Sequence, residues 1–83
     1  MKVKATFDRI GRNVGPVPVE AEGDDEREIA LDLWRFVMGR RGGKKWIGSQ
    51  ELEVHVDLDK ETVQLIVGGF RSAGTGYVEV IEP

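Results

Sequence analysis

Residues 24–38 read DDEREIALDLWRFVM, and they form the one segment of this sequence with the apolar periodicity of an amphipathic helix. At about 100° per residue, four apolar side chains share a stripe that should face a sheet: Ile29, Leu33, Phe36 and Val37. Three further apolar side chains, Leu31, Trp34 and Met38, extend around the helix beyond that stripe. The helix therefore carries more apolar surface than one contact with a sheet covers.

The ends of this helix are marked by capping signals. Asp25, followed three residues later by Glu28, resembles a capping box, and acidic side chains suit the positive pole at a helix N-terminus. The glycines at 42–43 stop the helix at its other end. We expect the helix to run from about Asp24 to Met38 or Gly39.

Two alternating segments precede the helix and predict a β-hairpin. The apolar positions of the first are Val3, Ala5 and Phe7, and those of the second are Val17, Val19 and Ala21. Pairing Phe7 with Val17 and Val3 with Ala21 keeps every apolar side chain on one face. Pro18 cannot donate a ladder hydrogen bond, so we expect the second strand at an edge of the sheet.

Further strands follow the helix. Leu52, Val54 and Val56 alternate with charged residues, and a turn at 59–60 pairs them with Val67, Leu65 and Val63 respectively. A last strand is expected over Tyr77–Ile81, after a loop at 71–76. The predicted order is ββαβββ, a mostly antiparallel five-stranded sheet with one helix packed on one face. We expect residues 1–83 to form a single small α+β domain.

Composition limits the function classes. The 83 residues are 40% hydrophobic and 33% charged, which is typical of a globular domain, and no apolar run approaches the length that crosses a bilayer. The residues 1–8 alternate charged and apolar side chains, unlike a signal peptide. With no cysteine, disulfides and thiolate metal sites are excluded. These features favour a cytoplasmic protein without a membrane partner.

A basic cluster lies just beyond the helix, within an acidic sequence of formal net charge −3. Trp34 and Trp46 flank it, and its cations are Arg40, Arg41, Lys44 and Lys45. Three interpretations stay open: cations that suit the negative pole of the helix end, a site for an acidic protein partner, or a nucleic-acid site in which the tryptophans stack bases. Arg9 and Arg12 are candidate additions to this cluster.

The surplus apolar residues have two interpretations as well. Trp34 and Met38 either cover a sheet edge and the underside of the basic loop, or they form a contact with a partner. A second candidate patch follows from registering Phe70 opposite Tyr77 in the last hairpin, which gathers four apolar side chains on the outer face: Ile66, Phe70, Tyr77 and Ile81. This patch is either a stabilising cross-strand cluster or a protein interface.

Catalytic and metal sites find no support in the sequence. His55 is the only histidine, and its expected neighbours Glu53 and Asp57 give a weak ligand set without a second histidine or cysteine. The segment Gly74–Gly76 has no following helix and therefore fails as a dinucleotide-binding motif. We expect a protein that is not an enzyme and needs no metal or other cofactor.

The opening segment carries a resemblance. Residues 1–13, which end in FDRIGRN, resemble the start of small accessory proteins encoded by actinobacterial phages. The resemblance covers about a sixth of the chain and includes no functional motif, so it implies no site residues. It implies a small protein that binds a host component. A nucleic-acid-binding accessory protein that uses residues 40–45 is the alternative, and self-association into a homodimer stays open.

Overall fold

The computed structural model describes residues 1–48 and 51–83, and it contains one helix and five strands within them. The strands β1 (Lys2–Ile10) and β2 (Asn13–Glu22) come first, and the helix α1 (Glu26–Val37) follows. The chain then forms β3 (Leu52–Asp57), β4 (Thr62–Val67) and β5 (Arg71–Glu82). This is the expected ββαβββ order.

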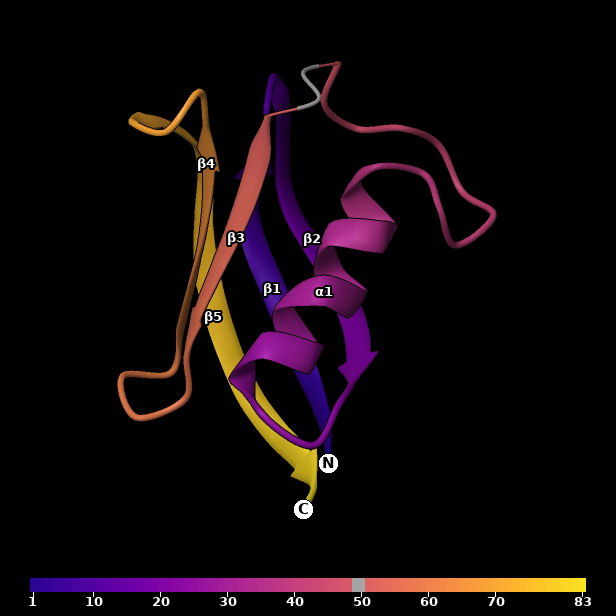
Figure 1. The fold of residues 1–83 in the computed structure, drawn as a ribbon, viewed down its shortest axis with the longest axis vertical. Helices are drawn as coiled ribbons and strands as arrows, with labels where there is room; N and C mark the ends of the chain where they lie inside the picture. Colours follow the sequence, from indigo (N-terminus) through magenta and orange to yellow (C-terminus); the bar gives the residue numbers. More distant parts are fainter. Residues whose placement is uncertain (49–50) are drawn as a thin grey trace.

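All five strands form one antiparallel sheet in the order β2-β1-β5-β4-β3, and α1 packs on one face of it (Figure 1). The last strand, β5, lies at the centre of the sheet between β1 and β4. The two strands that flank α1 in the sequence, β2 and β3, are the two edges of the sheet. The helix therefore connects opposite edges by crossing the sheet.

The registers of the first two hairpins confirm the predictions. Phe7 pairs with Val17 and Val3 with Ala21 in the first, while Val54 pairs with Leu65 in the second. Alternation directs the apolar side chains of both hairpins to the face that α1 covers. Fully buried residues on that face include Val3, Phe7, Val63, Leu65 and Val78.

The helix begins as its capping signals predict. Asp25 is the N-cap, and its Oδ1 accepts a hydrogen bond from the Glu28 backbone N–H at 2.9 Å. The Glu28 Oε1 accepts from the Asp24 N–H at 2.8 Å, which completes the reciprocal arrangement. Ile29, Leu33 and Val37 are fully buried, so three of the four expected stripe positions face the core, while Phe36 is half-buried.

The predicted loop at 71–76 is wrong, because β5 begins at Arg71. Gly74 and Gly76 lack side chains where the neighbouring strand comes closest: a Cβ on Gly74 would collide with the Arg9 carbonyl oxygen, and one on Gly76 with the Thr6 carbonyl oxygen. Glycine at these positions permits close strand pairing at the centre of the sheet, although the composition of residues 71–76 is typical of a loop. No helix in the described ranges is long and apolar enough to cross a membrane.

Candidate functional site

The segment after α1 folds back onto the end of the helix. Gly39 adopts a φ of 72°, which lets the chain reverse, and the Trp46 N–H donates a hydrogen bond to the Val37 carbonyl at 2.8 Å. Ile47 then enters the core, with 7% of its surface exposed. The loop at 39–46, which projects beyond the helix in Figure 1, is therefore attached at both of its ends.

One side of this loop carries a stack of rings and cations. The rings of Phe36 and Trp46 have centroids 5.7 Å apart, and the Lys44 Nζ lies 3.9 Å from the Trp46 centroid. The Arg41 guanidinium lies 5.8 Å from the Phe36 centroid. Such contacts between cations and aromatic faces are favourable and hold the cations in place.

Trp34 lies on a different side of the helix. Residues 34 and 36 are about 200° apart around an α-helix. Because Trp46 packs against Phe36, the two tryptophans lie on different sides of the helix and do not form one stacking platform. The Arg40 guanidinium lies 5.8 Å from the Trp34 ring centroid, and Trp34 also lines an open groove of about 650 Å³ between α1 and β3. The structure therefore divides the predicted cluster into two ring–cation pairs, Trp34 with Arg40 and Trp46 with Lys44.

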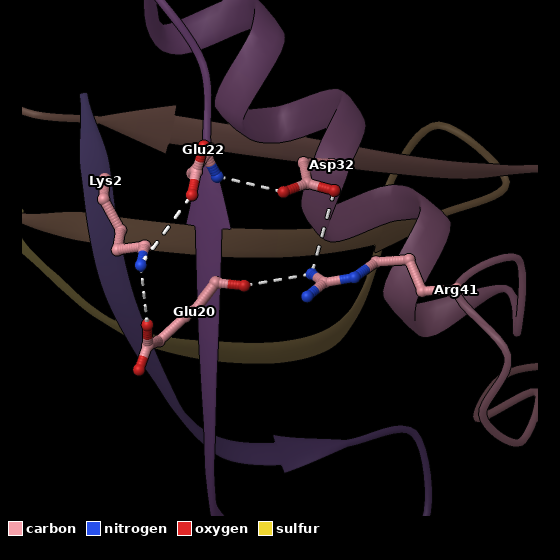
Figure 2. Close-up of polar contacts among 5 residues, drawn as sticks. All are labelled: Lys2, Glu20, Glu22, Asp32 and Arg41. Carbon is pink, nitrogen blue, oxygen red and sulfur yellow. Dashed lines mark hydrogen bonds and ion pairs between the residues drawn. The ribbon is translucent and has the colours of Figure 1, made fainter.

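Arg41 takes part in a network that binds the loop to β2 (Figure 2). Its Nη1 donates a hydrogen bond to the Glu20 carbonyl at 3.0 Å and lies 3.8 Å from Asp32 Oδ1. Asp32 Oδ2 accepts a hydrogen bond from the Glu22 N–H at 2.9 Å. The Lys2 ammonium lies 3.6 Å from Glu20 and 3.8 Å from Glu22. Arg41 thus has internal partners that account for its position.

The remaining cations of the loop differ from Arg41. Arg40, Lys44 and Lys45 are exposed, and within the described ranges none of them lies within ion-pair distance of a carboxylate. Arg9 is engaged elsewhere, donating to the carbonyls of Gly11 at 2.9 Å and Ser72 at 3.3 Å. The loop therefore groups three exposed cations, Arg40, Lys44 and Lys45, that have no ion-pair partner among the described residues.

Met38 does not belong to an accessible surface. Its exposed fraction is 6%, because it packs into the core at the end of α1. The prediction that Met38 contacts a partner is corrected accordingly. Trp34 and Trp46 are half-buried against the same core, and each presents only part of its ring.

The second predicted patch rests on a wrong register. Tyr77 pairs with Thr62, and Ile66 pairs with Ser72, because the chain turns tightly at 68–70. Gly68 and Gly69 both have positive φ, of 67° and 83°, which permits this short turn. The turn places Phe70 at one end of the sheet, while Ile81 lies near the other end of β5. Phe70, Tyr77 and Ile81 are exposed, but they do not form one cluster with Ile66.

The groove between α1 and β3 is a feature that helix periodicity alone could not locate. Its apolar lining comes from Ala30, Leu31, Trp34 and Val54, and its charged lining from Asp25, Arg27 and Glu28. The surplus apolar surface of the helix was its only signal in the sequence. Elsewhere, His55 Nε2 lies 3.6 Å from Glu53 Oε1, with both side chains more than half exposed.

Comparisons with protein-family models, with curated proteins and with solved structures find no match to this chain. The functional interpretation therefore depends on the geometry of the loop and of the sheet.

Proposed function

We propose that the protein is a binding protein without enzymatic activity, and that it recognises an acidic segment of a partner protein through Arg40, Lys44 and Lys45. We refer to these three residues as the basic tip. Their accessible charge, on a loop attached to the core at both ends, is the observation that carries the proposal. Because the loop is already ordered, binding loses less conformational entropy than it would with a free segment.

The two ring–cation pairs support this function. Contact with the faces of Trp34 and Trp46 restricts Arg40 and Lys44 while their charges remain exposed to a carboxylate. Arg40 can form paired hydrogen bonds with a carboxylate, and the lysines add less directional attraction. The chain as a whole has a formal net charge of −3, so the part outside these three cations is more acidic still, which disfavours approach of an acidic partner elsewhere.

Nucleic-acid binding through the same residues is the alternative, and the ring geometry favours it less. A base that stacks on Trp46 would have to displace Lys44, and one that stacks on Trp34 would have to displace Arg40. Stacking on exposed aromatic rings supplies much of the affinity of single-strand binding proteins. The tip therefore offers charge without the free ring faces that such binding uses.

We place this function in the cytoplasm, because the sequence lacks cysteine. The resemblance of residues 1–13 to phage accessory proteins makes a host protein the candidate partner. The experiment is capture of partners from a cell extract by the immobilised protein, by a triple variant Arg40→Gln/Lys44→Gln/Lys45→Gln, and by a control.

The control is Lys4→Gln/Lys60→Gln/Arg71→Gln, which removes the same charge from three exposed positions on the strands and their turns. We expect the unmodified protein and the control to retain a common acidic partner that the triple variant loses. Recovery of the same partners by all three proteins would exclude the basic tip from the site. Steeply salt-dependent binding to DNA or RNA, lost in the triple variant, would support the alternative instead.

A further inference from the structure

The two edges of the sheet differ in how well they are closed. At the β2 edge, the Met1–Gly23 hydrogen bond fixes which residues of β2 face β1, so positions 18, 20 and 22 direct their backbone groups outward. Pro18 has no N–H, the Glu20 carbonyl accepts from Arg41, and the Glu22 N–H donates to Asp32 (Figure 2). This edge has little capacity to pair with another strand.

At the β3 edge, the same reasoning identifies backbone N–H and C=O groups that point away from the sheet and are open to pairing. The Gly68 N–H donates to the Glu51 carbonyl, and these two residues continue the β3–β4 register. Hydrogen-bonded pairs alternate along an antiparallel ladder, so Leu52, Val54 and Val56 direct their N–H and C=O groups away from β4. Within the described ranges, no hydrogen bond from another segment reaches these three residues.

The open edge lies beside uncovered apolar surface. The groove between α1 and β3 is lined by Val54 from the strand and by Leu31 and Trp34 from the helix. Leu31 is 46% exposed although it is a large apolar residue in the middle of the helix. A strand added to β3 would extend the sheet around the helix and cover this surface.

We propose that β3 pairs with β3 of a second copy of this chain, antiparallel about a twofold axis at Val54. In this register Val54 faces Val54, and Leu52 faces Val56 of the second copy. All three have the outward backbone groups that a hydrogen-bonded pair needs. The two helices then lie on the same face of a continuous sheet, beside the axis, where Leu31 and Trp34 of one copy meet those of the other.

Charge complementarity favours a second copy as the occupant. The Val54-centred register places Glu53 opposite His55 of the second copy, and the twofold axis generates this pair twice. At its ends it also places Glu51 opposite Asp57, a like-charge pair that acts against this register. The groove carries both charge signs, from Arg27 and Glu28, which suits contact between identical surfaces.

Two registers with the axis further along β3 are less favourable. An axis at His55 places Glu53 opposite Asp57 twice and one histidine opposite the other, so like charges face each other and no carboxylate faces an imidazole. An axis at Val56 would pair Val54 with Leu58 of the second copy and would need the Leu58 N–H for that pair. This N–H already donates to Glu26 Oε2 at 2.8 Å. The Val54-centred arrangement alone of these three uses open backbone groups and places a carboxylate opposite an imidazole.

Cysteine crosslinking tests the register directly, because the natural sequence contains no cysteine. In the proposed dimer, Val54→Cys brings two Cα atoms to about 5.5 Å, within the range of a disulfide. His55→Cys leaves them about 8 Å apart, because two residues of offset separate them along the strand. Under mild oxidation we expect Val54→Cys to form a covalent dimer of twice 9.3 kDa and His55→Cys to remain mostly uncrosslinked.

Sedimentation equilibrium of cysteine-free protein tests the dimer independently. We expect Leu31→Glu to raise its dissociation constant at least about tenfold, equivalent to about 1.4 kcal/mol. The matched control Phe70→Glu, at a residue 85% exposed in the β4–β5 turn, should leave it unchanged. A single-chain mass for the unmodified protein up to millimolar concentration would overturn the proposal. Crosslinking of His55→Cys in preference to Val54→Cys would overturn it as well, as would equal effects of Leu31→Glu and Phe70→Glu on the dissociation constant.

Discussion

The Arg41 Nη1 atom lies 3.8 Å from Asp32 Oδ1, and this ion pair joins the loop after α1 to the middle of the helix. Each partner also bonds to the backbone of β2, at Glu20 and Glu22 respectively. A cation that the sequence placed in a binding cluster therefore has a structural role. It helps to fix the loop that presents the basic tip and to close one edge of the sheet.

We expect the residues of this network to contribute unequally to the free energy of unfolding. Asp32→Ala removes the ion pair and the acceptor of the Glu22 N–H, and we expect it to lower the free energy of unfolding by about 1–2 kcal/mol. Lys2→Met removes two ion pairs of similar length to more exposed carboxylates, and we expect it to cost less than about 1 kcal/mol. Urea denaturation of both variants measures the difference. Equal losses would show that Asp32 does not hold the network together.

The N-cap supplies a second stability prediction. Asp25→Ala removes the acceptor of the Glu28 N–H, and loss of such a cap typically costs about 1 kcal/mol. The matched control is Arg27→Ala, an exposed position in the same turn without a capping role, expected within about 0.5 kcal/mol of the unmodified protein. Thermal unfolding followed by circular dichroism compares them, and a control as damaging as Asp25→Ala would contradict the capping role.

The close contact between β1 and β5 predicts a severe effect at Gly74. A Cβ there would collide with the Arg9 carbonyl, and the φ of 155° is rarely adopted by other residues. We expect Gly74→Ala to cost about 2–4 kcal/mol, in the range of strained core substitutions. Gly43→Ala is the control, since nothing lies within 4 Å of its Cβ. Chemical denaturation should leave that control within about 0.5 kcal/mol of the unmodified protein.

The contrast between the hairpins explains how far the sequence could predict the fold. Strict alternation at residues such as Val3 and Val54 fixed both the pairing face and the register of the first two hairpins. Residues 71–76 have no such alternation, because the chain there approaches its neighbours through glycine. Their strand structure comes from pairing with β4, joined by β1 only at Gly76, a tertiary effect that composition does not reveal.

The candidate site was predictable in residue type but not in arrangement. The clustering of basic residues in the sequence located the basic loop. The hydrogen bond from the Trp46 N–H to the Val37 carbonyl follows no helical or strand periodicity, so the sequence pattern does not predict it. That bond, with the helix geometry, separates Trp46 from Trp34. Burial of Met38 at the helix end likewise depends on packing around the loop.

Asp8 predicts a dependence of stability on pH. The Thr75 hydroxyl and then the Thr75 N–H, at 2.7 Å and 3.0 Å from the carboxylate, hold the pKa of Asp8 below its ordinary value of 3.8. Because the pKa of Asp8 is lower in the folded state, the Asp8 carboxylate stabilises the fold at pH values above its ordinary pKa. That contribution is lost as the pH falls through the pKa of the folded state. Denaturation between pH 5 and about 2 should show a shallower decline for Asp8→Asn than for the unmodified protein. Parallel declines would contradict the contact.

Binding at the basic tip can be measured through Trp46 in a Trp34→Phe background. Its fluorescence is titrated with a peptide rich in glutamate and aspartate, and in parallel with a DNA oligonucleotide. Because Lys44 lies over the Trp46 ring, we expect a saturable change with the peptide, preserved in the control Lys60→Gln. In Lys44→Gln/Lys45→Gln the affinity should fall at least about tenfold. Saturation with DNA but not with the peptide, or unchanged affinity in the double variant, would contradict recognition of an acidic protein by this loop.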